Sequence, residues 1–231
     1  MSKTHAFVFA RGGSKGLPRK NVLTIAGIPL IAHGIQLAQQ LKDVQHVFIS
    51  TDCSEIAEIG VAYGAELIER PAELASDSAP EWLAWQHSIR TVQERYGSFE
   101  RFLSLPATAP LRILKDVERC LDALRPDIDL VITMAAAHRS PWFNMVTFGS
   151  EGNVKLVAID ADVQRRQDAP ICFDVTTVAY VARPEFILQA SNMWQGSVAG
   201  VEIPVHRSID IDTQLDLDIA RYLMEQWKPA S

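Results

Sequence analysis

The sequence predicts an α/β fold built around a mostly parallel central sheet. Short apolar runs, which are typical of buried strands, alternate along the chain with segments whose apolar residues repeat at helical spacing. This alternation favours βαβ units, in which a helix connects two parallel strands. The 231 residues, 48% of them hydrophobic, suffice for the core of one large domain. We therefore expect residues 1–231 to form a single domain.

The first half of the chain sets this rhythm. The expected elements, in order, are a strand at 6–10, a helix at 30–41, a strand at 47–50, a helix at 54–63 and a strand at 66–68. A helix over about 80–96 follows, because Trp82, Trp85 and Ile89 recur at helical spacing. Ser78 to Glu81 precede it in a capping-box pattern, and we expect the two tryptophans to lie in the core.

The second half adds further strands and one excursion from the core. The expected elements are strands at 101–105, 130–134, 176–182 and 201–205 and helices at 115–124 and 213–227, giving a sheet of at least five strands. Residues 139–170 instead show short alternating runs around a glycine-containing turn at 149–153. We interpret 139–170 as a small β-rich insertion that protrudes from the α/β core.

Composition excludes several classes of protein. The pI near 5.5 argues against nucleic-acid binding, which requires an extended basic face. The three cysteines are odd in number and far apart, so neither a disulfide framework nor a thiolate zinc site is indicated. No apolar run approaches the length of a membrane span or a signal-peptide core. A cytoplasmic protein without a membrane partner is expected.

The loop Ala10–Asn21 is the most informative segment. It carries three glycines and four cations directly after the first predicted strand, and the first acidic residue of the chain is Asp43. Residues 1–42 therefore sum to +6 and the remaining residues to −12, for a net charge of −6. Glycine lets backbone N–H groups approach phosphate oxygens, and cations at the carboxyl end of a strand supply countercharge. The loop is predicted to bind phosphate, the alternative being a solvated basic loop.

Other readings of the same glycines are less consistent with the sequence. The segment 12–16 matches the G-x-S-x-G nucleophile elbow of serine hydrolases, but Pro18 opposes the helix that this motif needs. Neither the Walker A spacing nor the dinucleotide-binding spacing is present, so kinase-type ATP use and NAD binding lose their main support.

Four stretches in order resemble the acylneuraminate (CMP-sialic acid) cytidylyltransferases. They are the loop 10–21 and the segments 70–77, 108–112 and 208–217. The resemblance implies a Rossmann-like three-layer sandwich of the nucleotide-diphospho-sugar transferase type, with 139–170 as a dimerisation element of a homodimer. It also implies a Mg²⁺-dependent reaction in which CTP and an acidic nine-carbon-type 2-keto-3-deoxy sugar give a CMP-sugar and pyrophosphate.

The resemblance also assigns residues to roles. Lys20, Arg11 and Asp212 are the expected catalytic residues. The expected nucleotide-binding residues are Arg11, Gly12, Gly13, Ser14, Lys15, Lys20, Asn21, Arg70, Ser76 and Asp77. Cations and backbone N–H groups can neutralise charge at the attacked phosphate and at the leaving group, which is the main requirement of such a transfer.

Carboxylates elsewhere allow more than one interpretation. Asp210 and Asp212 stand two apart in an extended stretch, so both point to one side, and we expect them to bind Mg²⁺. The alternative is that Asp212 or Thr213 caps the last helix. Asp216 and Asp218 are expected near the positive end of that helix, where acidic side chains are favoured. Ser76 and Asp77 serve equally well as helix caps, and Asp52 with Glu55 is interpreted as a capping box.

The sugar side departs from the pattern of the family. Pro106 replaces a common glutamine, Phe143 a common lysine, and Asp174 an arginine that would pair with the sugar carboxylate. We expect the sugar site to comprise Thr108, Phe143, Arg165, Arg166 and Asp174, with Arg165 and Arg166 as substitute cations. Two alternatives stay open: a transferase for another nucleotide and sugar, and a nucleotide-binding homologue without turnover.

Overall fold

Seven strands form the central sheet of the computed structural model, in the order β11-β7-β10-β6-β1-β4-β5. The structure describes residues 3–13, 16–149, 152–159 and 163–226. The sheet strands are β1 (Thr4–Phe9), β4 (Val44–Thr51), β5 (Glu66–Glu69), β6 (Arg101–Ser104), β7 (Leu130–Ala136), β10 (Phe173–Ala182) and β11 (Val198–Glu202). Strand β10 runs antiparallel to both of its neighbours and the other pairings are parallel. The prediction of a mostly parallel α/β sheet is confirmed.

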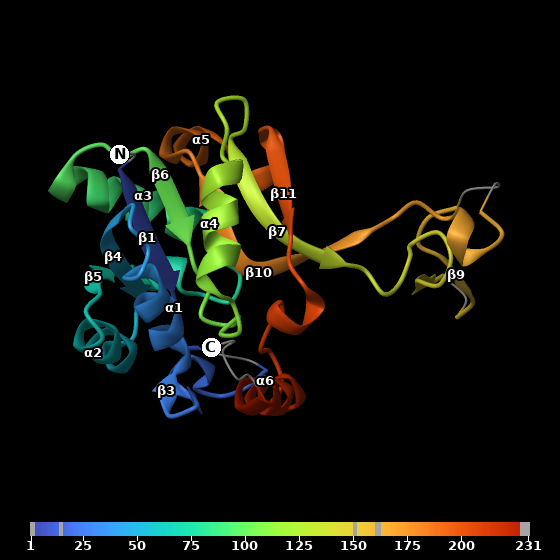
Figure 1. Ribbon diagram of the computed structural model, residues 1–231, viewed down its shortest axis with the longest axis horizontal. Helices are drawn as coiled ribbons and strands as arrows, with labels where there is room; N and C mark the ends of the chain where they lie inside the picture. Colours follow the sequence, from blue (N-terminus) through green and yellow to red (C-terminus); the bar gives the residue numbers. More distant parts are fainter. Residues whose placement is uncertain (1–2, 14–15, 150–151, 160–162, 227–231) are drawn as a thin grey trace.

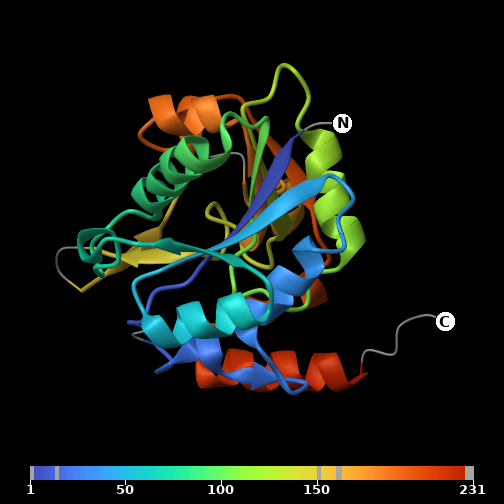
Figure 2. The same cartoon turned by 90° about the vertical axis from the view of Figure 1, so that its left-hand side faces the viewer.

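Helices cover both faces of this sheet (Figure 2). The helices are α1 (Leu30–Ala38), α2 (Ser54–Ala62), α3 (Glu81–Tyr96), α4 (Leu114–Ala123), α5 (Pro184–Gln189) and α6 (Gln214–Gln226). The first strand shows why two layers form, since Ala6 and Val8 pack with α1 and α4 residues while Phe7 and Phe9 pack with α3 residues. Alternating side chains of a strand point to opposite faces, so an apolar strand needs cover on both.

Strand β10 contains an irregularity that affects the edge of the sheet. Its pairing with β7 shifts register between Thr176 and Tyr180. Thr133 on β7 stabilises this stretch, because its hydroxyl lies within hydrogen-bond distance of the Thr176 and Ala179 carbonyls and accepts from the Ala179 N–H. The irregular residues between them include Thr177, whose hydroxyl lies 3.5 Å from that of Thr108 in the loop that follows β6.

Beyond the sheet, β7 and β10 continue into an arm that projects away from the body of the molecule (Figure 1). The arm carries the two-stranded sheet of β8 (Val146–Phe148) and β9 (Val154–Leu156). These strands correspond to the predicted β-rich insertion, although part of the predicted turn at 149–153 lies outside the described residues. Its role in dimerisation stays a prediction.

A third apolar cluster closes the edge of the sheet where the cationic loop lies. It joins α6 to the hairpin of β2 (Thr24–Ile25) and β3 (Ile28–Pro29), with Leu30, Ile211 and Leu217 among its buried members. This hairpin and α5 were not predicted. Across the described residues, no helix is both long enough and apolar enough to cross a membrane.

Two predicted caps are wrong. Helix α3 begins after Pro80, and no side chain makes a capping hydrogen bond there, so Ser78 does not form the expected capping box. Helix α2 is preceded by Cys53 and likewise lacks a side-chain cap. The Asp52 carboxylate instead accepts a hydrogen bond from the Gly12 N–H at 2.9 Å. A long-range partner therefore takes the acceptor that local capping rules assign to the helix.

Candidate active site

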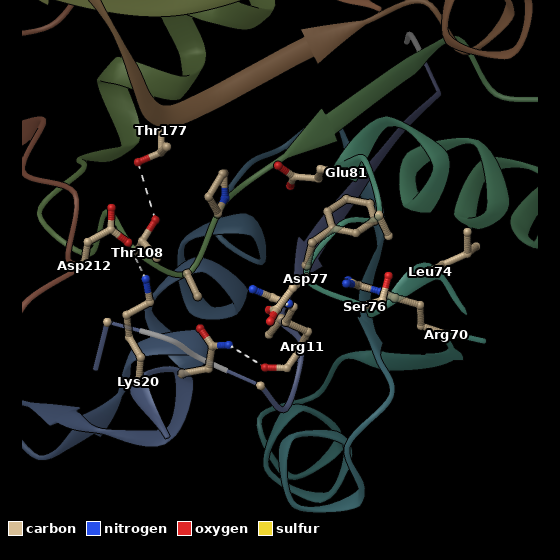
Figure 3. A pocket seen from close by; sticks show the side chains of 18 residues that line it. Arg11, Lys20, Arg70, Leu74, Ser76, Asp77, Glu81, Thr108, Thr177 and Asp212 are labelled. Carbon is tan, nitrogen blue, oxygen red and sulfur yellow. Dashed lines mark hydrogen bonds and ion pairs between the residues drawn. The ribbon is translucent and has the colours of Figure 1, made fainter. Parts of the chain in front are cut away.

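A cavity of about 400 Å³ lies at the carboxyl ends of β1 and β6 (Figure 3). Three stretches of chain line it: the loop after β1, the segment from β5 to the start of α3, and the loop after β6. Thr177 and Asp212 complete the lining. Carboxyl ends of parallel strands are where open α/β sheets place their ligands. The cavity therefore unites motif segments that lie far apart in the sequence, such as those of Lys20 and Asp212, which are 192 residues apart.

The basic loop is held in place from several sides. Arg11 makes an ion pair with Asp77 at 2.5 Å, and its backbone carbonyl accepts from Asn21 Nδ2 at 3.0 Å. Gly12 is anchored to Asp52, and Arg19 pairs with Glu55 at the start of α2. Ser14 and Lys15 lie outside the described residues. An acidic α2 start thus positions a cationic loop, which explains Asp52 and Glu55 better than capping does.

Lys20 contacts the C-terminal motif on one side of the cavity. Its Nζ lies 2.7 Å from Asp212 Oδ1, and its side chain is only 14% exposed whereas that of Asp212 is 69% exposed. Gly16 allows the backbone of the basic loop to approach the backbone of Asp212, because a Cβ at this position would overlap the backbone oxygen of Asp212. The pair places one cation and one carboxylate together at the cavity wall (Figure 3).

Arg70 forms the opposite wall. It is buried, donates from Nε and Nη2 to the hydroxyl and carbonyl of Ser50, and lies 5.6 Å from the centre of the Phe9 ring. Desolvation lowers its pKa from the usual value, with Glu81 and Asp52 opposing the effect. Ser76 lines the cavity beside it and bonds to the Glu73 carbonyl, so neither Ser76 nor Asp77 caps α3.

Asp210 and Asp212 flank a buried isoleucine, as the alternation predicted. The Ile211 side chain is fully buried and its N–H donates to the Thr108 carbonyl at 2.9 Å, tying the motif to the loop after β6. Asp212 lines the cavity. Asp210 Oδ1 is enclosed and has no hydrogen-bond partner among the described residues. Asp216, in contrast, accepts from the Thr213 N–H and hydroxyl, which confirms its expected role at the helix start.

Arg112 lies behind the cavity wall and contacts two of the residues that line it. It is buried and lies beside the carbonyl oxygens of Pro106 and Thr177, to which its Nη2 donates. Desolvation lowers its pKa to about 9, while Asp210 and Asp116 act in the opposite direction. Sequence analysis assigned no role to Arg112. Its position inside an otherwise apolar Pro-Leu segment was the available signal.

Comparison with known proteins agrees with this geometry. A family model described as "Cytidylyltransferase" matches residues 5–82. A Campylobacter coli protein, "Post-translational flagellin modification protein B", is 31% identical over 98% of this chain and 97% of its own length. The Campylobacter jejuni "CMP-N,N'-diacetyllegionaminic acid synthase" is also 31% identical, over 97% of this chain and 96% of its own.

The chain belongs to the acylneuraminate cytidylyltransferase family. It is therefore a nucleotidyltransferase, as its motifs predicted. Among solved structures, one titled "CMP:2-keto-3-deoxy-manno-octonic acid synthetase complexed with CTP" is similar in fold, with a TM-score of 0.73 and 19% identity over 97% of this chain and 99% of that one. The "N-acylneuraminate cytidylyltransferase A" of Danio rerio is 28% identical over 93% of this chain, but this covers only 49% of that protein.

The sugar-side residues predicted for this cytidylyltransferase are only partly brought together. Thr108 lines the cavity, 3.5 Å from the Thr177 hydroxyl. Arg165 pairs with Asp168, and Arg166 donates to the His138 carbonyl. Both arginines lie in the arm, as does Phe143, which is 39% exposed, and Asp174 lies on the outer part of β10. None of these four lines the cavity within one chain, so their contribution to sugar binding stays a prediction.

Sequence reasoning missed Glu81 and Thr177, which both line the cavity of the cytidylyltransferase. Glu81 is the first residue of α3, and its Oε1 accepts from Trp85 Nε1 at 3.2 Å. Its exposed surface faces the cavity, whose walls desolvate the carboxyl and raise its pKa. The capping pattern at 78–81 had drawn attention to this acid as a helix signal. Thr177 left no sequence signal, because its position depends on the register shift in β10.

Proposed function

We propose that this protein transfers CMP from CTP to the anomeric 2-hydroxyl of an acidic, nonulosonic-type 2-keto-3-deoxy sugar and releases pyrophosphate. The main support is that Arg11, Lys20 and Asp212 line one cavity. The chain also aligns over 97% of its length with a CMP-N,N'-diacetyllegionaminic acid synthase. Such a transfer needs positioning and charge neutralisation more than covalent chemistry.

The nucleotide occupies the half of the cavity formed by the basic loop and the segment after β5. Arg11 and Lys20 supply cations, and Lys20 has three N–H donors, of which the contact with Asp212 uses one. The proposed nucleotide contacts are those of Arg11, Gly12, Gly13, Ser14, Lys15, Lys20, Asn21, Arg70, Ser76 and Asp77. Asp52 is added as a positioning residue, because it fixes the backbone of Gly12.

The donor set at the C-terminal motif fits Mg²⁺. Asp212 presents a largely exposed carboxylate to the cavity, and Asp210 Oδ1 is an enclosed oxygen without a partner among the described residues. The part of the chain that the structure describes holds no cluster of three or more acidic, histidine or cysteine side chains suited to a metal. This agrees with Mg²⁺, which typically takes one or two carboxylates and completes its shell with phosphate and water. When bound, the ion would neutralise charge on the triphosphate.

In the reaction, the anomeric oxygen forms a bond to the α-phosphorus while the bond from that phosphorus to the bridging oxygen of the β-phosphate breaks. The hydroxyl proton passes to solvent, and pyrophosphate leaves with the electron pair of the broken bond. Lys20 and Arg11 stabilise the charge that grows on the phosphate oxygens and on the leaving group. Thr108 and Thr177 present hydroxyl groups where the sugar would enter.

We propose that the arm makes the protein a homodimer. It carries exposed apolar side chains, including Phe148 at 82% exposure and Ile159 at 82%, and Ile171 near its base is 86% exposed. Apolar groups exposed together in this way mark interaction sites. Multi-angle light scattering should give about twice 25.6 kDa for the wild type and a reduced mass for Phe148→Asp. A wild-type monomer would contradict the proposal.

We also propose that the protein is located in the cytoplasm. Its free cysteines, Cys53, Cys120 and Cys172, suit a reducing compartment.

Pyrophosphate release tests the proposed reaction. CTP, UTP, GTP and ATP are each offered with a panel of nonulosonic and other 2-keto-3-deoxy acids, with and without Mg²⁺. We expect release only with CTP, Mg²⁺ and an acidic keto-sugar. Release with GTP or UTP and a sugar phosphate would support the alternative transferase, and CTP binding without turnover across the panel would support a silent homologue.

A further inference from the structure

Glu81 is an acidic side chain in the cavity to which the proposed reaction gives no task. It lies at the start of α3 and extends from that helix into the cavity (Figure 3). Helix capping does not explain it, because Pro80 holds the capping position and no side-chain capping bond is made. An acid facing a site built for a triphosphate opposes binding by like charge unless it contacts another part of the ligand.

Arg70, Leu74, Ala79 and Glu81 line one side of the cavity, which we call the slot. The segment from Arg70 to Glu81 contributes Leu74 and Ala79 to the cavity wall, and the Phe9 ring lies beneath the guanidinium of Arg70. Lys20 and Asp212 lie on the other side of the cavity (Figure 3). Lys20 is therefore apart from the slot, whereas Arg11, which pairs with Asp77, lies between the two. This arrangement suits a nucleotide whose base binds at one end of the cavity and whose triphosphate extends toward Lys20.

Hydrogen-bonding groups in the slot have fixed directions. Trp85 holds Glu81 Oε1, and Oε2 accepts no bond from any residue in the described ranges. Arg70 donates hydrogen bonds from Nε and Nη2 to Ser50, whereas its Nη1 makes no hydrogen bond with any of the described residues. The slot thus offers cationic N–H donors at Arg70 and a carboxyl acceptor at Glu81.

We propose that Glu81 determines the choice of nucleobase by accepting a hydrogen bond from the exocyclic amine of cytosine. Cytosine carries an amine donor at one end of its recognition edge and acceptors along the rest, which matches an acceptor at Glu81 and donors at Arg70. Uracil replaces the amine with a carbonyl oxygen, which would face the carboxyl oxygen of Glu81. A site built to hydrogen-bond one group strongly rejects the analogue that lacks it. This inference rests on the proposed use of CTP.

The proposal does not depend on the charge of Glu81. Desolvation by the surrounding cavity walls raises the pKa of the carboxyl, and Asp210 adds to the effect, while Trp85 and Arg70 oppose it. In either protonation state one oxygen remains an acceptor for the amine.

Calorimetric titration of the whole protein with CTP and with UTP, in the presence of Mg²⁺, tests the assignment in the wild type and in Glu81→Gln, Glu81→Ala and Glu94→Gln. The glutamine side chain can turn either its carbonyl or its amide nitrogen toward the base and so serves both bases. Glu94→Gln removes the same charge from an exposed position on the same helix and is the matched control. Circular dichroism confirms that each variant is folded.

We expect the wild type and Glu94→Gln to favour CTP over UTP by roughly a hundredfold or more, and this ratio to fall at least tenfold in Glu81→Gln through tighter UTP binding. Glu81→Ala should lose affinity for CTP without gaining it for UTP. An unchanged ratio in Glu81→Gln, beside intact CTP binding, would overturn the role of Glu81 alone. No CTP binding by the wild type would instead overturn the proposed function, and this inference with it.

Discussion

Acid should destabilise this protein through His5, a buried histidine at the end of the sheet opposite the active site. His5 lies on β1 with no exposed surface, and both ring nitrogens lack hydrogen-bond partners among the described residues. Desolvation lowers its pKa from 6.5 to about 4, with further lowering by His46 and Lys3 and an opposing effect of Glu66. The ring is therefore neutral in the folded protein at pH values where the unfolded chain is protonated.

The sign and size of the effect follow from this difference. Between pH 6.5 and 4 the unfolded chain binds a proton at His5 that the folded protein excludes, so the stability falls as the pH falls. The contribution is fully present above pH 7. At 1.36 kcal/mol per pKa unit the loss amounts to roughly 2–3 kcal/mol at pH 4.5 and to about 3 kcal/mol when the titration is complete.

Urea denaturation at pH 7.5, 6.5, 5.5 and 4.5 measures this loss against His5→Phe, in which a ring that does not titrate takes the place beside Phe48 and Phe99. The free energy of unfolding of the wild type should fall relative to that of His5→Phe by roughly 2–3 kcal/mol from pH 7.5 to 4.5. His138→Gln, at an exposed position, should show no such relative change. A wild-type to His5→Phe difference that is constant with pH would refute the reasoning.

Three further substitutions test a buried ion pair and two contacts of the basic loop. Asp116→Ala removes both hydrogen bonds to Arg207 from a carboxylate that is 1% exposed, and should lower the free energy of unfolding by about 3 kcal/mol or more in urea titrations. Gly16→Ala should raise KM for CTP at least about tenfold with little change in Tm, because the new Cβ overlaps the Asp212 backbone and displaces the loop; an unchanged KM would contradict this. Asp52→Ala frees the Gly12 N–H and should weaken CTP binding by about 1 kcal/mol in calorimetry, whereas Glu58→Ala on the outer part of α2 should not.

The alternating pattern of the sequence predicted most of the elements, because burial on both faces of a parallel sheet leaves a strong apolar signal. The split of Ala6 and Phe7 between two cores is one such case. The antiparallel direction of β10 was not predictable in the same way. It depends on where the arm returns to the sheet, and neither a local propensity nor a period of apolar residues encodes that path.

The residues of the active site were likewise predictable only in part. Arg11, Lys20, Arg70 and Asp212 could be predicted because each lies in a contiguous motif whose chemistry is specific, and the structure brings all four to one cavity. Glu81 was read as part of a helix cap and Asp52 as another. Capping preferences are local, whereas Asp52 accepts a hydrogen bond from Gly12, 40 residues away, and Glu81 faces a cavity built from segments that are distant in the sequence.

Product analysis by ³¹P NMR tests the central claim most directly. The protein is incubated with CTP, Mg²⁺ and the keto-sugar that gives the greatest pyrophosphate release. We predict one new phosphodiester signal from the CMP-sugar and an equimolar pyrophosphate signal, both absent for Asp212→Asn at the same protein concentration. A diphosphate-linked sugar, or hydrolysis of CTP to CMP without a sugar-bound phosphorus, would contradict transfer of CMP to the anomeric oxygen.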